Sequence, residues 1–377
     1  VMKHSMYLFI VLLCSAVFLT SCWDQELLKE SKLVYGAGFD YDSNNSIRTT
    51  FVVRNLGVPV SQGGVYSNRI VSVTGKSPRD TRLQMDRLIS KQVSASKNQL
   101  LLLGDKVAKQ NIDHMFDILF RDPKSPLDAR VAVVDGLAED YFNLDHIGDT
   151  LITEFISNLI KGAENKTEAT KMTVEKTFRY SKDEGQDYAL PYITLNEEIN
   201  APELTGLALF HKTAFTGVTL SPIESTLLLL MKNERSKKTN LIETLDSEDK
   251  GFLMNTATIN VRKSTSDKSF SFKNQKLEKV VINLELRGNV EEYPQDHLVK
   301  ESQVKKISEE LSENLTLKAD EVLKKLQKAN CDFLGIGRDM SAYHPEAWNA
   351  ESWDEQFKNL KLESHIKIKI SETGIIK

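Results

Sequence analysis

The side chains that most often perform chemistry are spread thinly along this sequence. No histidine lies within four residues of another histidine or of a cysteine, so no set of zinc ligands can be read from the spacing. Gly335-Ile336-Gly337 begins like a dinucleotide-binding fingerprint but lacks the third glycine. We interpret this pair, and also Gly36 and Gly38, as strand positions where the backbone bulges or another element approaches closely.

Two pairs of adjacent glutamates raise the possibility of hydrolytic chemistry. Glu197-Glu198 and Glu291-Glu292 would each supply the two carboxylates that a glycosidase acting on cell wall needs. Neighbouring side chains point in different directions, however, and adjacent acids normally face solvent. The Gly-x-Ser-x-Gly turn of serine hydrolases does not occur in the sequence. We therefore expect no catalytic residue, no metal and no cofactor.

The composition is that of a folded, water-soluble body with an unremarkable charge. The 377 residues are 40% apolar and 27% charged, enough for two or three domains with their own cores. The 49 Lys and Arg residues face 53 Asp and Glu residues, which gives a net charge of −4. This balance offers no electrostatic reason to bind a polyanion, so we do not expect nucleic acid to be a partner.

The most informative cysteine is Cys22. An uncharged apolar run from Met6 to Leu19 follows Lys3, and at 14 residues it is short for a membrane span but typical of a secretory signal. The run ends in Leu19-Thr20-Ser21-Cys22, which is similar to a bacterial lipobox. A signal peptide over 1–21 would then be removed, and Cys22 would carry S-diacylglycerol and an N-acyl chain, enough to hold a protein at a membrane. The alternative is a plain signal peptide or anchor helix in which Cys22 is incidental, and Cys331 is expected to be a small buried core residue.

The first half of the chain alternates between strand-like and helix-like patterns after a polar tether at 22–32. This alternation predicts an α/β domain over 33–197. Ser77-Pro78-Arg79-Asp80 has the residues of a helix start, and 165–187 is expected to be an exposed strand pair or a long connection. The expected elements are a hairpin of 33–41 and 47–55, strands at 99–103 and 130–134, and helices at 105–119 and 151–160.

The second half is richer in strands and predicts an α+β region over 198–377. Ser221-Pro222-Ile223-Glu224 is a capping box that starts an apolar helix ending near Lys232. A division of this half into a middle and a C-terminal domain near 249–255 is left open. The expected elements are a hairpin within 204–220, strands at 256–262, 269–272, 280–287 and 365–370, and helices at 301–328 and 348–360.

Several short blocks of residues are informative through their order and spacing rather than one by one. They are Cys22-Trp23-Asp24, Leu33 to Asp40, Leu101 to Gly104 with Phe120 to Pro123, Thr205 to Phe210 with Gly217, and Asp332 to Gly337 with Tyr343 to Trp348, Trp353, Phe357 and Thr373-Gly374. In this order they resemble the Ger(x)C family, the lipoprotein C subunits of nutrient germinant receptors in spores of Bacillus and its relatives.

The resemblance implies a fold of three α/β-type domains and a role without catalysis. It implies a subunit tethered by lipid to the outer face of the spore inner membrane, acting with membrane-embedded A and B subunits in the response to amino acids, sugars or similar germinants. Whether this subunit contacts the germinant is left open. Trp348, Trp353 and Phe357 are candidate partner contacts, although packing of one helix onto its sheet is the favoured explanation for Trp353 and Phe357.

Two other functions remain as alternatives. A solute-binding lipoprotein of a transporter would need two similar α/β lobes with a ligand cleft between them, and the two halves of this sequence differ in pattern. A cell-wall enzyme would need a convergent pair of acids in a cleft.

Overall fold

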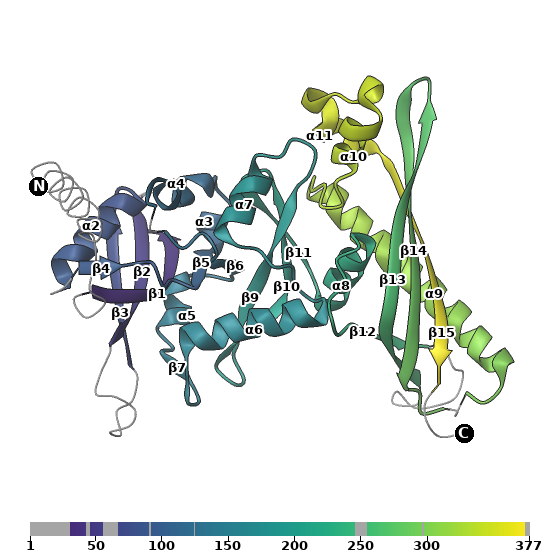
Figure 1. Cartoon of the computed structure of the whole chain (residues 1–377), viewed down its shortest axis with the longest axis horizontal. Helices are drawn as coiled ribbons and strands as arrows, with labels where there is room; N and C mark the ends of the chain where they lie inside the picture. The colour runs from purple at the N-terminus through teal and green to yellow at the C-terminus, as the bar shows by residue number, and fades with distance from the viewer. Residues whose placement is uncertain are drawn as a thin grey trace, which may run out of the picture.

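The computed structural model describes residues 31–42, 46–55, 67–89, 92–123, 125–245, 255–295 and 298–373. Cys22 and the signal peptide expected over 1–21 lie outside these residues, as do 249–254 of the expected division near 249–255. The described chain is elongated, with a large sheet at one end and a small sheet at the other (Figure 1). This mixed architecture confirms the expected combination of an α/β first half and an α+β second half.

The large sheet has nine strands, in the order β11-β10-β9-β6-β5-β1-β2-β3, with β4 paired to β1. The central strands β1, β5, β6 and β9 run parallel, whereas the outer pairs are antiparallel hairpins. The strands are β1 (Ser31–Tyr41), β2 (Ile47–Asn55), β3 (Ser67–Gly75), β4 (Gln92–Ser94), β5 (Leu100–Gly104), β6 (Arg130–Val134), β9 (Tyr188–Asn196), β10 (Ala201–His211) and β11 (Ala214–Leu220).

Helices cover both faces of this sheet. Leu101 and Leu103 of β5 pack with α3 and α4, and Leu100 and Leu102 pack on the opposite face with α5 and α6. A parallel strand buried on both faces must be apolar throughout, which explains the unbroken leucine run. The helices are α2 (Pro78–Leu88), α3 (Asp105–Ala108), α4 (Asp113–Arg121), α5 (Ala138–Phe142), α6 (Ile152–Lys166) and α7 (Val174–Ser181); β7 (His146–Ile147) and β8 (Thr150–Leu151) form a separate hairpin.

The structure confirms the helix start, the glycine positions and the hairpin expected in the first part of the chain. Ser77 is the N-cap of α2 and accepts a hydrogen bond from the backbone N–H of Asp80. A side chain at Gly36 or Gly38 would collide with Phe142 or a neighbour on α5 or α6, which confirms close approach of another element. The pairing of β1 with β2 also shifts register between Val34 and Gly36, which confirms a bulge there. The hairpin of β1 and β2 also forms as expected.

Three elements differ from the sequence-based expectations. The helix expected from Asp105 to Leu119 is two helices, because the N–H of Ile112 donates to the carbonyl of Thr213 rather than to a helical partner. The polar segment 165–187 contains α7, whose N-cap is Thr173. The two strands expected at 256–262 and 269–272 form one strand, because the neighbouring strand pairs along nearly its whole length.

The small sheet has the order β12-β13-β14-β15. Val280, Ile282, Leu284 and Leu286 of β14 are buried, so one face of the sheet is core, as expected from their alternation. Helices α8 and α9 pack on that face. The elements are α8 (Pro222–Met231), β12 (Asn240–Thr244), β13 (Thr256–Lys273), β14 (Lys276–Glu292), α9 (Glu301–Lys328), α10 (Ile336–Tyr343), η4 (Pro345–Ala347), α11 (Ala350–Asn359) and β15 (Lys361–Glu372).

One hydrophobic core joins the two sheets. Helix α8, which begins with the capping box formed by Ser221 and Glu224, is buried from Ser225 to Met231. Its leucines belong to a cluster that also contains Leu207 of the large sheet and Ile282 of the small sheet. The expected boundary at 197/198 falls in the turn between β9 and β10, which pair as a hairpin. Neither the large sheet nor the core ends at this boundary.

Candidate functional site

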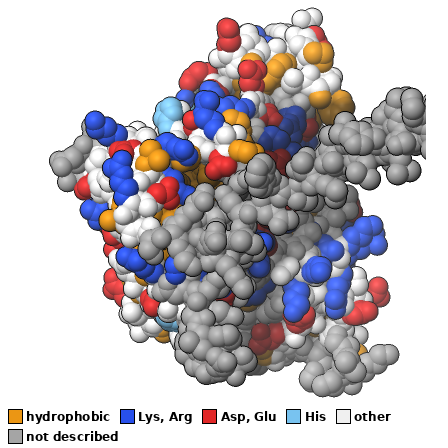
Figure 2. Space-filling view, turned by 60° about the vertical axis from the view of Figure 1, so that its left-hand side comes forward, with side chains coloured by type: hydrophobic (Ala, Val, Ile, Leu, Met, Phe, Trp, Pro, Cys, Tyr) orange, Lys and Arg blue, Asp and Glu red, His pale blue; other side chains and the backbone are white. Residues whose placement is uncertain are grey.

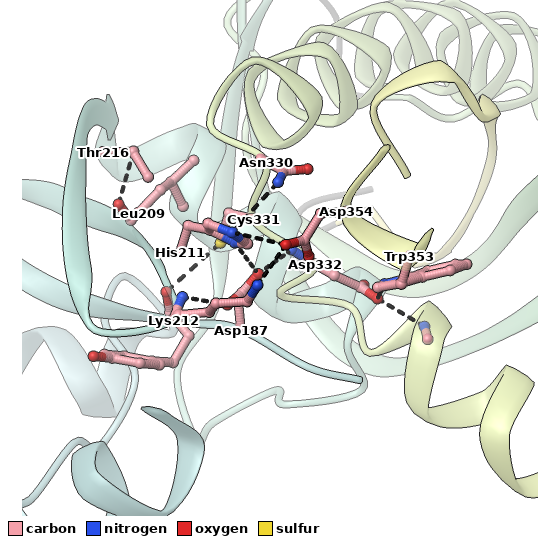
Figure 3. Close-up of polar contacts among 12 residues, drawn as sticks. Asp187, Leu209, His211, Lys212, Thr216, Asn330, Cys331, Asp332, Trp353 and Asp354 are labelled. Atoms are coloured by element: carbon pink, nitrogen blue, oxygen red, sulfur yellow. Dashed lines mark hydrogen bonds and ion pairs between the residues drawn. The ribbon is translucent and has the colours of Figure 1, made fainter. Parts of the chain in front are cut away.

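A cluster of polar side chains lies where the two halves of the chain meet (Figure 3). It consists of Asp187, just before β9; His211, at the end of β10; Asn330 and Asp332, between α9 and α10; and Asp354, on α11. We call these five residues the junction cluster. Three of the five are aspartates. The hydrogen bonds and the burial of these carboxyl groups decide whether the cluster is structural or reactive.

Asp332 is the buried centre of the cluster. Its Oδ1 accepts a hydrogen bond from the N–H of Ile336 at 2.9 Å, and its Oδ2 accepts from the N–H of Gly337 at 2.7 Å. Trp353 donates a third bond from Nε1 to Oδ2 at 3.2 Å. Burial raises the pKa of Asp332 to about 6, although the two backbone donors oppose this shift. The carboxyl group of Asp332 thus connects the start of α10 to α11 through hydrogen bonds.

Asp187 connects Asp332 to the large sheet. The N–H of Asp332 donates to Asp187 Oδ2 at 3.0 Å, and the N–H of Asp187 donates to the carbonyl of Asp332 at 3.0 Å. Asp187 Oδ1 accepts the N–H of Lys212 at 2.7 Å. This reciprocal pairing joins segments that are 145 residues apart in sequence.

His211 lies between two carboxylates. Its Nδ1 is 3.2 Å from Asp187 Oδ2, and its Nε2 is 3.5 Å from Asp354 Oδ2 and 3.4 Å from Asn330 Nδ2. Burial lowers the pKa of His211, but the hydrogen bond to Asp187 and the charges of Asp187 and Asp354 outweigh it, so the net pKa is raised. Lys212 also pairs with Asp354, so both residues at the end of β10 contact α11.

The backbones approach closely beside this cluster. A Cβ at Gly185 would lie 2.6 Å from the backbone nitrogen of Arg338, and that nitrogen donates to the carbonyl of Gly185 at 2.7 Å. The guanidinium of Arg338 also pairs with Asp183. The segment 183–187 therefore lies directly against 331–338, where only glycine fits.

The residues of the junction cluster hold the two halves of the chain together rather than perform a reaction. Cys331 is a fully buried thiol beside it, and burial raises its pKa well above the usual range, so it is a poor nucleophile. Its thiol is 3.6 Å from the carbonyl of Tyr188. Asp187 and Asp332 accept hydrogen bonds from backbone N–H groups, which makes them structural acceptors in this conformation.

The aromatic residues nominated from the sequence lie next to the cluster. Trp353 and Phe357 are buried, with 3% and 2% of their surface exposed, so they cannot offer a contact surface to a partner. This corrects the partner-contact hypothesis for both residues, since each packs into the core that joins the sheets. Trp348 is partly buried, with its ring centroid 5.1 Å from that of Trp353.

Other sequence candidates lie apart from the cluster. Glu197 and Glu198 are exposed in the turn after β9, and Glu291 and Glu292 are exposed at the end of β14. Gly335 and Gly337 are at the start of α10 rather than in a strand, and a Cβ at Gly337 would lie 2.6 Å from Trp353 Nε1. The expectation that another element approaches these glycines closely is therefore confirmed, whereas their expected place in a strand is wrong.

Sequence reasoning did not identify the junction cluster. Asp187, His211, Asp332 and Asp354 are separated by 24 to 145 residues in the pairs that contact each other, so no spacing rule connects them. The one available signal was the block from Asp332 to Gly337, in which an acid precedes two closely spaced glycines.

Three further observations concern the described part of the chain alone. It contains no group of three or more His, Cys, Asp or Glu side chains arranged to hold a metal ion. It also contains no helix that is both long enough and apolar enough to cross a membrane. On the face shown in Figure 2, the visible basic and acidic side chains are interspersed.

Comparison with known proteins places this fold in a defined class. The fold resembles that in a crystal structure of the GerBC protein, with a TM-score of 0.58 and 18% identity over 92% of this chain and 99% of that chain. Residues 24–195 match the family described as spore germination protein N-terminal domain. Residues 205–374 match the family described as spore germination B3/GerAC like, C-terminal. The gap between the matches contains the turn from β9 to β10.

Named relatives match over nearly their full length. The spore germination protein GerQC of Bacillus cereus is 20% identical over 97% of this chain and 98% of its own. Spore germination protein KC of Bacillus subtilis is 19% identical over 99% of this chain and 97% of its own. This chain belongs to the Ger(x)C family of spore germination proteins.

Proposed function

We propose that this chain is the lipid-anchored C subunit of a spore nutrient germinant receptor. It acts without catalysis on the extracytoplasmic face of the spore inner membrane, in a complex with membrane-embedded A and B subunits. The observation that carries the proposal is the pair of family matches, which together run from residue 24 to residue 374 in the expected order.

The lipobox-like sequence supports the anchor. Two or more acyl chains on Cys22 would hold the folded body at the membrane, whereas one chain gives only reversible binding. Tethering confines the body to a thin layer beside membrane-embedded partners and so raises their effective concentration without any new contact. The anchor would thereby favour assembly of the receptor.

The geometry of the junction supports a role in assembly rather than in chemistry. The buried carboxyl of Asp332 and the pair formed by Asp187 and His211 fix the two halves of the chain against each other. A rigid body of this kind presents its outer surfaces to partners in a constant relative position. The unequal sheets, nine strands against four, do not form the matched lobes of a solute-binding lipoprotein.

The test uses spores whose other genes of this family have been deleted. We expect deletion of this gene to abolish dipicolinate release in response to at least one nutrient class, and the native gene to restore it. Cys22→Ala should fail to restore it, whereas Cys14→Ala, which changes a cysteine outside the lipobox, should restore it. Unchanged germination of the deletion strain on every nutrient would refute the receptor role.

The anchor has its own readout. Labelled palmitate should be incorporated into the native chain and the Cys14→Ala variant, and both should sediment with membranes. The Cys22→Ala variant should incorporate none. Equal labelling of Cys22→Ala would refute lipidation at Cys22 while leaving the receptor role to the germination assay.

A further inference from the structure

A cleft of about 540 Å³ lies between the end of α8, the inner face of β13 and helix α10. Its lining includes Lys232, Lys268, Phe270, Asp339, Tyr343 and His344. None of the five residues of the junction cluster lines it, although the charge of Asp332 acts on Lys232 through space. The proposed receptor role makes no use of this cleft.

Lys232 is the unusual group in the cleft. Its ammonium makes no hydrogen bond or ion pair with any residue in the described part of the chain, although most of the side chain is covered. Burial, and then the neighbouring charge of Lys268, lower the pKa of Lys232 to about 8. Gly335 makes room for the ammonium, since a Cβ there would lie 3.0 Å from Lys232 Nζ.

Lys268, Asp339 and Asp267, which also line the cleft, already have direct partners. Lys268 Nζ is 2.5 Å from Asp339 Oδ2 and donates to the carbonyl of Leu334 at 2.7 Å. Asp267 turns its carboxylate to the opposite face of β13, where it accepts from Asn283 at 2.9 Å. The Lys232 ammonium therefore has no direct hydrogen-bond or ion-pair partner among the described residues, although the charges of Asp332, Glu234 and Asp339 act on it through space. With these acids nearby, a monoanion suits the cleft better than a dianion.

The walls of the cleft are held together by hydrogen bonds and include aromatic side chains. The side-chain amide of Asn233 donates to the carbonyl of Ser266 at 2.6 Å and accepts its N–H at 2.7 Å, which fixes the end of α8 to β13. Phe270 lies against His344, with ring centroids 5.7 Å apart. Tyr343 is 76% exposed, so a large ring borders the cleft without packing into the core.

We propose that this cleft binds a small organic monocarboxylate, whose carboxylate pairs with Lys232 while its apolar part lies against Phe270 and Tyr343. The carboxylate of the ligand accepts the charge-assisted hydrogen bond that no described residue accepts from Lys232. The cleft is large enough for a small molecule. This goes beyond the receptor role, because a receptor subunit could act without binding any ligand here.

The test is calorimetric titration of the full-length chain, purified in detergent, with three probes. 3-Phenylpropionate carries the carboxylate, 3-phenylpropionamide has the same shape without the charge, and inorganic phosphate has charge without an apolar part. We expect 3-phenylpropionate to bind and the other two to bind at least about tenfold more weakly, which corresponds to the loss of one good interaction.

Variants locate the site. Lys232→Met should weaken 3-phenylpropionate at least about tenfold, Lys232→Arg should retain most of the affinity, and Tyr343→Ser should weaken it a few-fold without affecting folding. Lys324→Met, an exposed lysine of α9 outside the cleft, is the matched control and should change nothing. The proposal is overturned if the carboxylate does not bind, if the amide or phosphate binds as well, or if Lys232→Met binds normally.

Discussion

At the scale of single residues, two buried carboxylates act as helix caps supplied from outside the helix. Asp40 of β1 accepts the N–H groups of Ala138 and Glu139 at 2.8 and 3.0 Å, and Asp332 does the same for the start of α10. The N-cap residues of α5 and α10, Leu137 and Gly335, have no capping side chain. Each acid therefore satisfies orphan helix donors while fixing the helix to another element.

The Asp332→Asn variant should lower stability at pH 7 by about 1–3 kcal/mol, because the amide group cannot accept all three hydrogen bonds. The effect should depend on pH. The pKa of Asp332 in the folded state, about 6, is above the usual 3.8, so the folded state binds the proton more tightly than the unfolded state does. The contribution of Asp332 to the free energy of unfolding therefore falls as the pH rises from 4 through 6. The advantage of Asp over Asn should therefore shrink by about 2 kcal/mol between pH 4 and pH 7.

Urea unfolding at the two pH values measures this difference. Glu198→Gln, in an exposed turn, is the control and should show the same small effect at both. An advantage of Asp over Asn that stays constant with pH would contradict the raised pKa of Asp332.

At the scale of elements, helix α9 protects the open edge of β15. The N–H groups of Ser364, Ile366 and Ile368 donate to Asp320 Oδ1, Thr316 Oγ1 and Ser312 Oγ at 2.9, 3.1 and 3.1 Å. Side chains four apart on a helix match N–H groups two apart on a strand, because both spacings are about 6–7 Å. The helix thus takes the place of a neighbouring strand and blocks pairing with another chain.

The double variant Ser312→Val/Thr316→Val should remove two of these acceptors; the change at Thr316 keeps the volume, and the change at Ser312 adds one methyl group. We expect a loss of about 1–3 kcal/mol for each unsatisfied N–H, together with self-association through the exposed edge. Chemical unfolding and sedimentation velocity measure the two effects. Ser302→Val, in the exposed first turn of α9, is the control, and a double variant as stable and monomeric as this control would refute the role of the hydroxyls.

At the scale of the whole molecule, the sheets share a core and should unfold together. Helix α8 belongs to a cluster that reaches both Leu207 of the large sheet and Ile282 of the small sheet. The large sheet also runs through the boundary expected at 197/198. Two independent domains would each need a core of its own.

Urea unfolding followed by two probes tests this cooperativity. In a Trp23→Phe background, fluorescence reports Trp348 and Trp353 near the small sheet, while circular dichroism reports the whole chain. We expect coincident transitions, and Leu228→Ala in α8 should shift both equally, by about 2–5 kcal/mol. Ile242→Ala, at an exposed position of β12, should shift neither, and separated transitions would show two independent domains.

Local physics explains why much of the fold could be predicted. The capping signals at Ser77 and Ser221 depend on hydrogen bonds within four residues, and the alternation of β14 depends on one strand facing one core. The expected elements were wrong where contact with a residue or strand far away in the sequence decided the local structure. The break before α4 depends on a hydrogen bond to Thr213, and the continuity of β13 depends on its pairing with β14.

The sequence by itself determined the mixed fold class, most of the elements and membership of the family, because these depend on periodicity, capping and the order of short blocks. The tertiary structure alone decided which polar residues meet. Asp187, His211, Asp332 and Asp354 form one cluster, and Lys232 lines the cleft beside β13 with no direct hydrogen-bond partner among the described residues. Charges interact through distance and burial in space, and sequence spacing fixes neither for residues on different elements.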